Sequence, residues 1–400
     1  MPLPRCAPNR TRTRAANCAA CRSARSTHFA ALLLLTAAWP AGPALAAEYR
    51  ATDRDGDTQV KVHLDEWKDA RRSDRVVPVK LYIPASDKPC PVVIFSHGLG
   101  GTREGYEFLG RFWASHGYLS VHLQHAGSDD QVWKDVPLKE RMEAMRRAAT
   151  QPLAAVARPA DVRFAIDTVL RLCDEPGSPL HRLPDEKKIG MAGHSFGAWT
   201  TLVSGGQTLV GMGGKSTTYA DARIRALIPM SAAVPRDPET WKRSYATVKL
   251  PAMHMTGTLD DSPITTTTPA DRLKPFEFCP GPAQGGGEQY LLNFDRGDHM
   301  IFAGRYAAAL AKTPRELAER YHQHIRIATL AFLDAHLRGD GEALRWLQSP
   351  QGLAARLGAD AQLRMKTASD AASAPSDASP LDRSPSPAAG GASATAPALP

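Results

Sequence analysis

The sequence predicts an α/β fold in which a mostly parallel sheet is covered by helices on both faces. Three observations predict it. Short apolar runs alternate with helical periodicities through the middle of the 400-residue chain. These runs are rich in valine and isoleucine and almost continuously apolar, as are strands that are buried on both faces of a sheet. Polar and glycine-rich segments follow several of the runs, where the carboxyl ends of parallel strands gather functional residues.

Seven strands are expected along the chain, each a short apolar run between polar or turn residues. Their ranges are 76–83, 91–96, 118–123, 188–192, 226–230, 253–256 and 290–294. Helical patterns fall between them over 106–115, 160–172 and from 198 onward, and a long helix over 317–337 closes the domain. The alternation favours parallel pairing, because a helical crossover returns the chain to the edge from which the previous strand began.

Residues 1–46 have the features of a signal peptide. The stretch holds six arginines and no acidic residue, an apolar run covers 29–39, and Ala44-Leu45-Ala46 fits an A-x-A cleavage site. The apolar run is too short to span a bilayer. We therefore expect cleavage after Ala46 and a periplasmic or secreted mature protein. A transit peptide is the alternative, and a translation start further downstream also fits the long basic region.

Loss of this leader changes the charge balance of the protein. Without its six arginines the formal net charge falls from +8 to about +2, so the basic character belongs mostly to the leader. No nucleic-acid partner is therefore expected. No stable membrane span is expected either, and the oligomeric state is left open.

Three cysteines fall in the leader and three remain in the mature chain, Cys90, Cys173 and Cys279. An exported protein permits a disulfide, but three thiols leave at least one unpaired, and the sequence does not decide whether any two pair. Their places relative to the expected strands and helices predict that all three lie at the amino-terminal edge of the sheet.

The remaining chain divides into a catalytic domain over 47–348 and a C-terminal extension over 349–400. From about residue 366 the extension consists mainly of Ala, Ser, Pro, Asp and Gly without a periodic apolar face. Such a composition buries too little apolar surface to become ordered, so this tail is predicted to be disordered.

The pentapeptide at 193–197, Gly-His-Ser-Phe-Gly, matches the pattern G-x-S-x-G. In this pattern a serine sits on a sharp turn between a strand and a helix. The buried run over 188–192 precedes the motif and a helical pattern from 198 follows it. The setting makes Ser195 the candidate nucleophile.

Two further segments supply partners for Ser195 at the same edge of the sheet. A serine hydroxyl needs a base to remove its proton during attack, and His299 after the last strand is the candidate. Asp260 after the preceding strand would orient the imidazole, with the neighbouring Asp261 as a rival. The chain order serine, aspartate, histidine is the order of the α/β-hydrolases.

Acyl transfer also needs donors for the negative oxygen of the tetrahedral intermediate. The N–H of the residue after the nucleophile, Phe196, is one candidate, and the glycine-rich loop at 97–101 supplies Leu99 as the other. His97 is interpreted as a residue that fixes this loop.

Two other features of the sequence concern a candidate lid and candidate ligand-binding loops. The segment over 131–150 contains Trp133, Met142 and Met145, and is either an amphipathic lid or an ordinary helical excursion. No cofactor or metal is expected. Residues 53–57 resemble the start of a calcium-binding loop, but the glycine is misplaced and Leu64 occupies the position of the bidentate ligand. Residues 214–216 resemble the end of a phosphate-binding loop, but Leu209 stands where the first glycine of that motif belongs.

Three segments resemble the plasma-type platelet-activating-factor acetylhydrolases and the bacterial dienelactone-hydrolase-related family. They are Phe-Ser-His-Gly-Leu-Gly-Gly at 95–101, Ala-Ser-His-Gly-Tyr at 114–118 and the pentapeptide at 193–197, within a similarity over roughly 76–339. The resemblance implies an α/β-hydrolase fold. It implies a triad at the positions of Ser195, Asp260 and His299, and an oxyanion hole at those of Leu99 and Phe196.

The expected function is that of an exported serine hydrolase that cleaves carboxylic esters through an acyl-enzyme. The substrate would be a small-molecule ester, with lipids among the candidates. An amidase or peptidase uses the same groups and is the alternative. A second alternative is a non-catalytic binding protein on a hydrolase scaffold.

Overall fold

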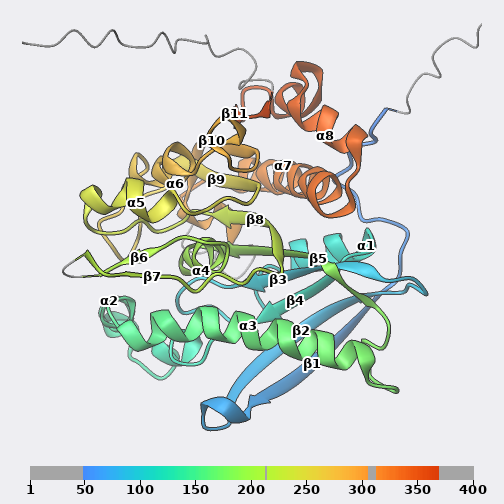
Figure 1. The fold of residues 1–400 in the computed structure, drawn as a ribbon. Coiled ribbons are helices and arrows are strands. Elements are labelled where there is room, and N and C mark those ends of the chain that lie inside the picture. The colour runs from blue at the N-terminus through green and yellow to red at the C-terminus, as the bar shows by residue number, and fades with distance from the viewer. Residues whose placement is uncertain (1–47, 212–213, 305–311, 369–400) are drawn as a thin grey trace, which may run out of the picture. The chain divides into compact units, whose positions relative to one another are not determined.

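The computed structural model describes residues 48–211, 214–304 and 312–368 of the chain. The predicted leader over 1–46 lies outside the described residues, as does the tail from 369 onward. The described residues form a nine-stranded sheet with helices on both faces, which confirms the predicted α/β class (Figure 1).

The strand order in this sheet is β1-β2-β4-β3-β5-β8-β9-β10-β11. The bounds are β1 Val60–Asp69, β2 Arg75–Pro84, β3 Cys90–Ser96, β4 Leu119–Leu123, β5 Pro184–His194, β8 Ile224–Met230, β9 Ala252–Leu259, β10 Gln289–Asp298 and β11 Ala361–Lys366. The strands from β4 to β10 pair in parallel, whereas β1, β2 and β11 pair antiparallel at the two sides. A separate short pair joins β6, Leu209–Val210, to β7, Ser216–Thr217.

The two outermost strands, β1 and β11, were not among the predicted strands. Both alternate apolar with charged residues, and several β1 side chains are exposed, so neither forms a continuous apolar run. β11 lies in the segment that the sequence analysis assigned to a C-terminal extension, and it pairs with β10. The folded unit continues past residue 348 to at least Lys366, because the chain returns to cover the open edge of the sheet.

Helices cover both faces of the sheet (Figure 1). Their bounds are α1 Glu107–Ser115, α2 Arg141–Ala149, α3 Pro152–Asp174, α4 Phe196–Ser204, α5 Trp241–Tyr245, α6 Lys274–Phe278, α7 Arg315–Leu333, α8 Gly341–Gln348 and α9 Ala355–Leu357. α1, α7 and α8 share one apolar core with the sheet, and α3 and α4 share the other. Within the described residues, none of these helices is both long and apolar enough to cross a membrane.

The three cysteines of the folded unit are free thiols. Cys90 begins β3, and Cys173 Sγ lies 3.7 Å from the carbonyl oxygen of Pro184, the first residue of β5. The carbonyl of Cys279 accepts a hydrogen bond from Lys366, which pairs with the first residue of β10. All three therefore lie at the amino-terminal edge of the sheet, as their places in the chain predict.

Candidate active site

Ser195 lies on the sharp turn between β5 and α4. Its φ of +57° and ψ of −115° are unusual for a residue other than glycine and hold the side chain out of the turn. The glycines at 193 and 197 let this turn approach β3 closely. A Cβ on Gly197 would overlap the Ser96 carbonyl, and one on Gly193 would overlap the carbonyl of Gly197. The sequence motif thus corresponds to a backbone that only glycine permits at two positions.

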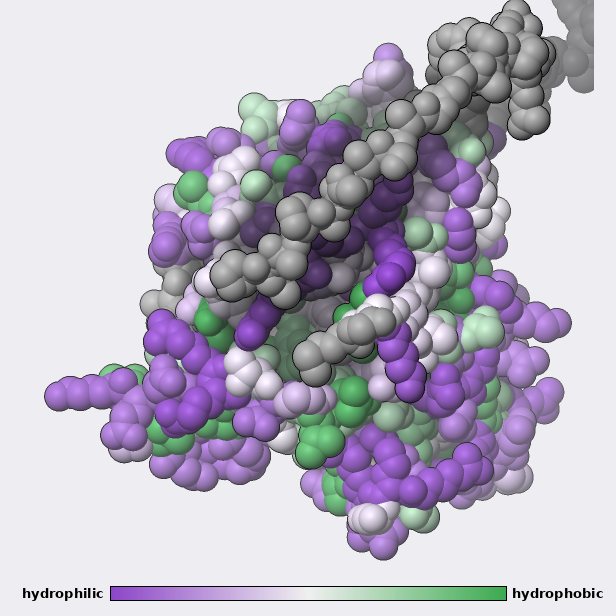
Figure 2. All heavy atoms as spheres, turned by 60° about the vertical axis from the view of Figure 1, so that its left-hand side comes forward, coloured by the Kyte–Doolittle hydropathy of each residue, from purple (hydrophilic) through white to green (hydrophobic). Residues whose placement is uncertain are grey.

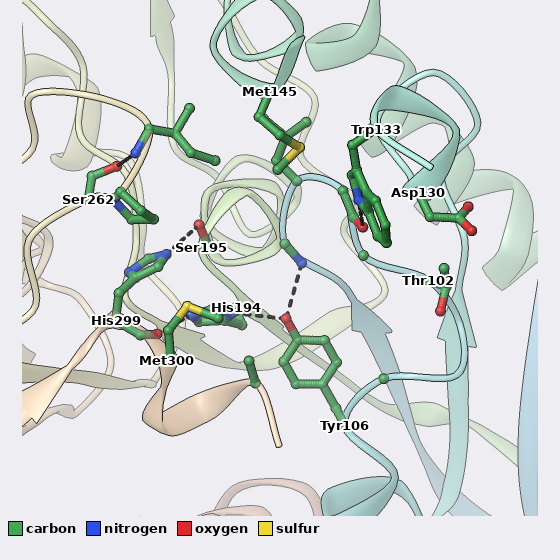
Figure 3. A pocket seen from close by; sticks show the side chains of 18 of the residues that line it. Thr102, Tyr106, Asp130, Trp133, Met145, His194, Ser195, Ser262, His299 and Met300 are labelled. Carbon is green, nitrogen blue, oxygen red and sulfur yellow. Dashed lines mark hydrogen bonds between the residues drawn. The ribbon is translucent and has the colours of Figure 1, made fainter. Parts of the chain in front are cut away.

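The structure brings the three predicted site residues into one hydrogen-bonded row. His299 Nε2 lies 2.9 Å from Ser195 Oγ (Figure 3). Its Nδ1 lies 2.7 Å from Asp260 Oδ1. His299 begins a short turn of helix directly after β10, and Asp260 directly follows β9. These adjacent parallel strands end at the same edge as β5, which is why residues so distant in the sequence meet.

The carboxylate of Asp260 is fully buried, whereas Asp261 is exposed at the cavity. One oxygen of Asp260 faces His299. The other accepts hydrogen bonds from Ser231 and from Thr256 Oγ1, the latter at 2.7 Å. Two hydroxyl groups thereby hold the carboxylate of Asp260 against the imidazole, and Asp261 makes no contact of this kind among the described residues.

Arg272 is a buried cation beside this row that the sequence analysis did not identify. Burial alone would raise the pKa of Asp260, but the charges of Arg272 and His299 outweigh it and hold that pKa at about 2. Burial lowers the pKa of His299, and Arg272 adds to this lowering against the opposing charge of Asp260. Asp260 is therefore ionised and His299 is neutral near pH 7.

The tautomer of His299 follows from these contacts. Nδ1 faces a carboxylate, so it carries the proton and Nε2 is left to accept one from the serine hydroxyl. The Arg272 Nη2 contact to Nδ1, at 3.2 Å, is then electrostatic rather than a hydrogen bond. The arrangement is chemically suited to general-base assistance at Ser195 Oγ.

Of the two predicted oxyanion donors, Leu99 lines the same cavity as Ser195, and Phe196 directly follows Ser195 in the chain. Phe196 is the first residue of α4, where a backbone N–H has no acceptor within the helix. In the loop, the N–H of Gly98 donates to Tyr106 Oη at 3.3 Å. The N–H of Gly100 donates to the Ser128 carbonyl at 2.9 Å, and that of Gly101 donates to the Gly98 carbonyl at 3.1 Å. Of residues 98–101 in the described chain, Leu99 alone keeps its N–H without such an acceptor.

Tyr106 and His194 form a second connection in the site. His194 Nε2 lies 2.9 Å from the carbonyl oxygen of His299, so it donates and Nδ1 accepts from Tyr106 Oη at 2.9 Å. Burial holds the pKa of His194 well below its usual value, so the ring is neutral. One directional chain therefore joins the Gly98 N–H to the backbone of His299 (Figure 3).

A cavity of about 850 Å³ opens over Ser195. Its walls include Trp133, Met142 and Met145 from the segment over 131–150, together with Leu259 and Ile264. Trp133 Nε1 donates to the Gly100 carbonyl at 2.8 Å, which ties this segment to the loop over the serine. The segment thus forms part of the cavity wall. Hydrophobic patches also interrupt the mostly hydrophilic face shown in Figure 2.

Among the described residues, no three His, Cys, Asp or Glu side chains are grouped so as to hold a metal ion. Beside the serine and histidine of the row, the cavity is lined by charged side chains, among them Arg103, Glu104 and Lys312. The fold is that of the α/β-hydrolase class, and the row has the geometry of a serine side chain with a neighbouring base.

The particular family it resembles is that of platelet-activating factor acetylhydrolase, isoform II, whose family model matches residues 76–145. The matched segment runs from β2 into α2 and includes the loop with Leu99, but not Ser195, Asp260 or His299. Comparison with the curated proteins gives no match.

Proposed function

We propose that the protein is an exported serine hydrolase that cleaves carboxylic esters through Ser195, His299 and Asp260. The observation that carries the proposal is the hydrogen-bonded row from Ser195 through His299 to Asp260, which opens into a largely apolar cavity. The resemblance to an acetylhydrolase family over residues 76–145 supports ester rather than other acyl substrates.

In the first half-reaction Ser195 Oγ attacks the ester carbonyl while His299 Nε2 takes its proton. Asp260 stabilises the resulting imidazolium without itself taking the proton. The carbonyl oxygen becomes negative and is met by the N–H groups of Leu99 and Phe196. When the tetrahedral intermediate collapses, the imidazolium protonates the leaving alkoxide and the acyl group remains on Ser195.

In the second half-reaction a water molecule replaces the alcohol. His299 removes a proton from the water as it attacks the acyl carbonyl, and the same two N–H groups meet the new negative oxygen. Collapse releases the carboxylic acid, and the proton returns through His299 to Ser195 Oγ. The apolar wall formed by Trp133, Met142 and Met145 favours substrates with an apolar acyl or alcohol part, lipid esters included.

Two measurements test this function. A fluorophosphonate probe should label the purified protein, and peptide mapping should locate the label on Ser195. A series of p-nitrophenyl esters from acetyl to palmitoyl, beside a matched anilide, should show ester turnover well above anilide turnover. Faster anilide cleavage would indicate an amidase, and absence of labelling and turnover would indicate a binding protein.

Export is the part of the proposal that rests on the leader alone. The basic region, the apolar run and Ala44-Leu45-Ala46 motivate it. N-terminal sequencing of the protein recovered from the periplasm or the medium should begin at Ala47. An intact leader on active cytoplasmic protein would contradict it.

A further inference from the structure

A second serine, histidine and aspartate row lies inside the protein, beneath the loop that carries Leu99. Ser96 Oγ lies 2.9 Å from His125 Nε2, and His125 Nδ1 lies 3.0 Å from Asp161 Oδ2. All three residues are 0% exposed, so this serine has no access to a substrate. Asp161 is further held by Arg72 at 2.7 Å and by Arg75 at 2.8 and 2.9 Å. The row is therefore a structural feature rather than a second catalytic centre.

The hydrogen bonds of this row all run in one direction, from Arg158 as the first donor to Asp161 as the last acceptor. Burial and the charge of Arg158 lower the pKa of His125 to about 4, so the ring is neutral and donates through Nδ1 to Asp161. Nε2 then accepts from the Ser96 hydroxyl, whose oxygen is left to accept from Arg158 Nη1 at 3.3 Å. The row thus fixes one edge of the Arg158 guanidinium.

Arg158 is also 0% exposed and contacts both segments that supply the proposed oxyanion donors. Its Nη1 donates to the His97 carbonyl at 2.8 Å and its Nε to Ser128 Oγ at 2.9 Å. Its Cζ lies 4.2 Å from the centre of the Phe196 ring, within the range of a cation–π contact. One buried cation therefore holds the loop after β3 against the first residue of α4.

The Gly98 carbonyl determines which way the Leu99 N–H points. It accepts from Gly101 N–H at 3.1 Å and lies 3.5 Å from Arg158 Nη2. It also accepts from His97 Nδ1 at 2.6 Å, which is the protonated nitrogen because Nε2 accepts from His125 N–H at 3.1 Å. In a trans peptide the C=O and the following N–H point in opposite directions. With the carbonyl turned toward Arg158, the Leu99 N–H is turned away from it.

We propose that Arg158, held by the buried Ser96, His125 and Asp161 row, is the positioning residue that aligns the N–H groups of Leu99 and Phe196 for the oxyanion. The inference rests on the proposed function. It assigns no contact between Arg158 and substrate. Its effect is to orient two peptide units, and it should therefore act on the tetrahedral state rather than on the bound ester.

The test compares Arg158→Met with the matched control Arg338→Met. Arg338 also donates to backbone carbonyls, those of His116 and Gly117, and its Cζ lies 4.1 Å from the Tyr118 ring centre, but these contacts involve neither the loop at 97–101 nor α4. Both variants remove a guanidinium that donates to backbone carbonyls and lies over an aromatic ring; Arg338 is in addition partly exposed and paired with Asp334. The readouts are Tm, kcat, KM and the inhibition constant of an aryl trifluoromethyl ketone, which adds to Ser195 Oγ and places a negative oxygen where the intermediate has it.

Arg158→Met should lower kcat about 10- to 100-fold, less than the loss on deleting an oxyanion donor outright. KM should stay within about threefold, and the inhibition constant should rise in parallel with the loss of kcat, because both report the tetrahedral state. Arg338→Met should lower Tm without changing this inhibition constant. Equal effects of the two variants on the inhibition constant, or none from Arg158→Met, would overturn the inference.

Two further experiments keep the test decisive. If Arg158→Met does not fold, Arg158→Lys retains a cation that cannot span the His97 carbonyl and Ser128 together, and the same inhibition constant should still rise. A crystal structure of the wild-type ketone adduct should place its oxygen within hydrogen-bond distance of the Leu99 and Phe196 nitrogens. Failure of the proposed function itself is distinguishable, because wild-type protein would then neither react with the ketone nor be labelled at Ser195.

Discussion

Arg272 and Asp260 form a buried ion pair, with Arg272 Nε 3.3 Å from Asp260 Oδ1. The same carboxylate oxygen lies 2.7 Å from His299 Nδ1, so the guanidinium and the imidazole share one acceptor. Arg272 Nη1 also donates to the carbonyl of Ser231 at 2.8 Å, the residue whose hydroxyl meets the other oxygen of Asp260. The cation thus stabilises the ionised carboxylate while opposing a positive charge on the imidazole.

The first prediction concerns the acid limb of the kcat/KM profile. Burial and then Arg272 lower the pKa of His299, so wild-type activity should persist below about pH 6.5, the ordinary histidine value. Arg272→Met removes one of the charges that lower the pKa of His299, so the acid limb of the profile should move to higher pH. The profile of each protein checks this. Arg223→Met, which breaks a distant pair with Asp221, should leave the limb in place, and a downward shift in Arg272→Met would contradict the electrostatic account.

The second prediction is that Ser195→Ala abolishes ester hydrolysis while the fold persists. The side chain lies on the surface of the cavity rather than in the core, so Tm should change little. Loss of a nucleophile in a serine hydrolase typically lowers kcat by about 10⁴ to 10⁶. Activity of the variant within tenfold of wild type, measured on freshly purified protein, would exclude Ser195 as the nucleophile.

The third prediction separates two adjacent carboxylates. Asp260→Asn should lower kcat at least about 100-fold, because an amide cannot stabilise the imidazolium and favours the wrong tautomer. Asp261→Asn is the matched control, since Asp261 is exposed and borders the cavity without facing His299. Steady-state kinetics on both variants decide between them. Equal losses, or a larger loss for Asp261→Asn, would move the orienting role to Asp261.

The fourth prediction concerns the chain from Tyr106 to His299. Tyr106→Phe removes the hydroxyl that accepts from Gly98 N–H and donates to His194, leaving two buried groups unpaired. The free energy of unfolding should fall by about 1–3 kcal/mol. kcat should fall as well, since the chain connects the loop of Leu99 with the backbone of His299. Urea unfolding and kinetics measure the two effects, and full kcat in a destabilised variant would show that the chain serves stability alone.

The sequence was sufficient to find the residues that meet at the carboxyl edge of the sheet. Ser195, Asp260 and His299 each follow an apolar strand, and parallel strands bring such positions together whatever their distance in the chain. The same reasoning does not find β1 or β11, because edge strands with one exposed face carry charged residues and lack a continuous apolar run.

Arg158 and Arg272 were missed for a different reason. Their contacts are with backbone carbonyls and with side chains remote in sequence, so no local pattern marks them. For Arg158 a signal was present. It and Asp161 occupy the stripe of α3 that otherwise buries Val162, Ala165 and Ile166, and charges on an apolar stripe indicate buried partners. Arg272 lies in a short turn between β9 and α6 and offers no comparable signal.

The position of the three thiols makes this protein suitable for oriented attachment. Burial raises the pKa of Cys90 to about 11 and that of Cys279 to about 12, whereas Cys173 is only half-buried. In a chain that begins at Ala47, a maleimide should therefore react at Cys173 first, at the edge of the sheet opposite Ser195. Protein attached to a solid support through Cys173 would have its cavity facing the solution. Turnover of the immobilised protein should therefore match that in solution.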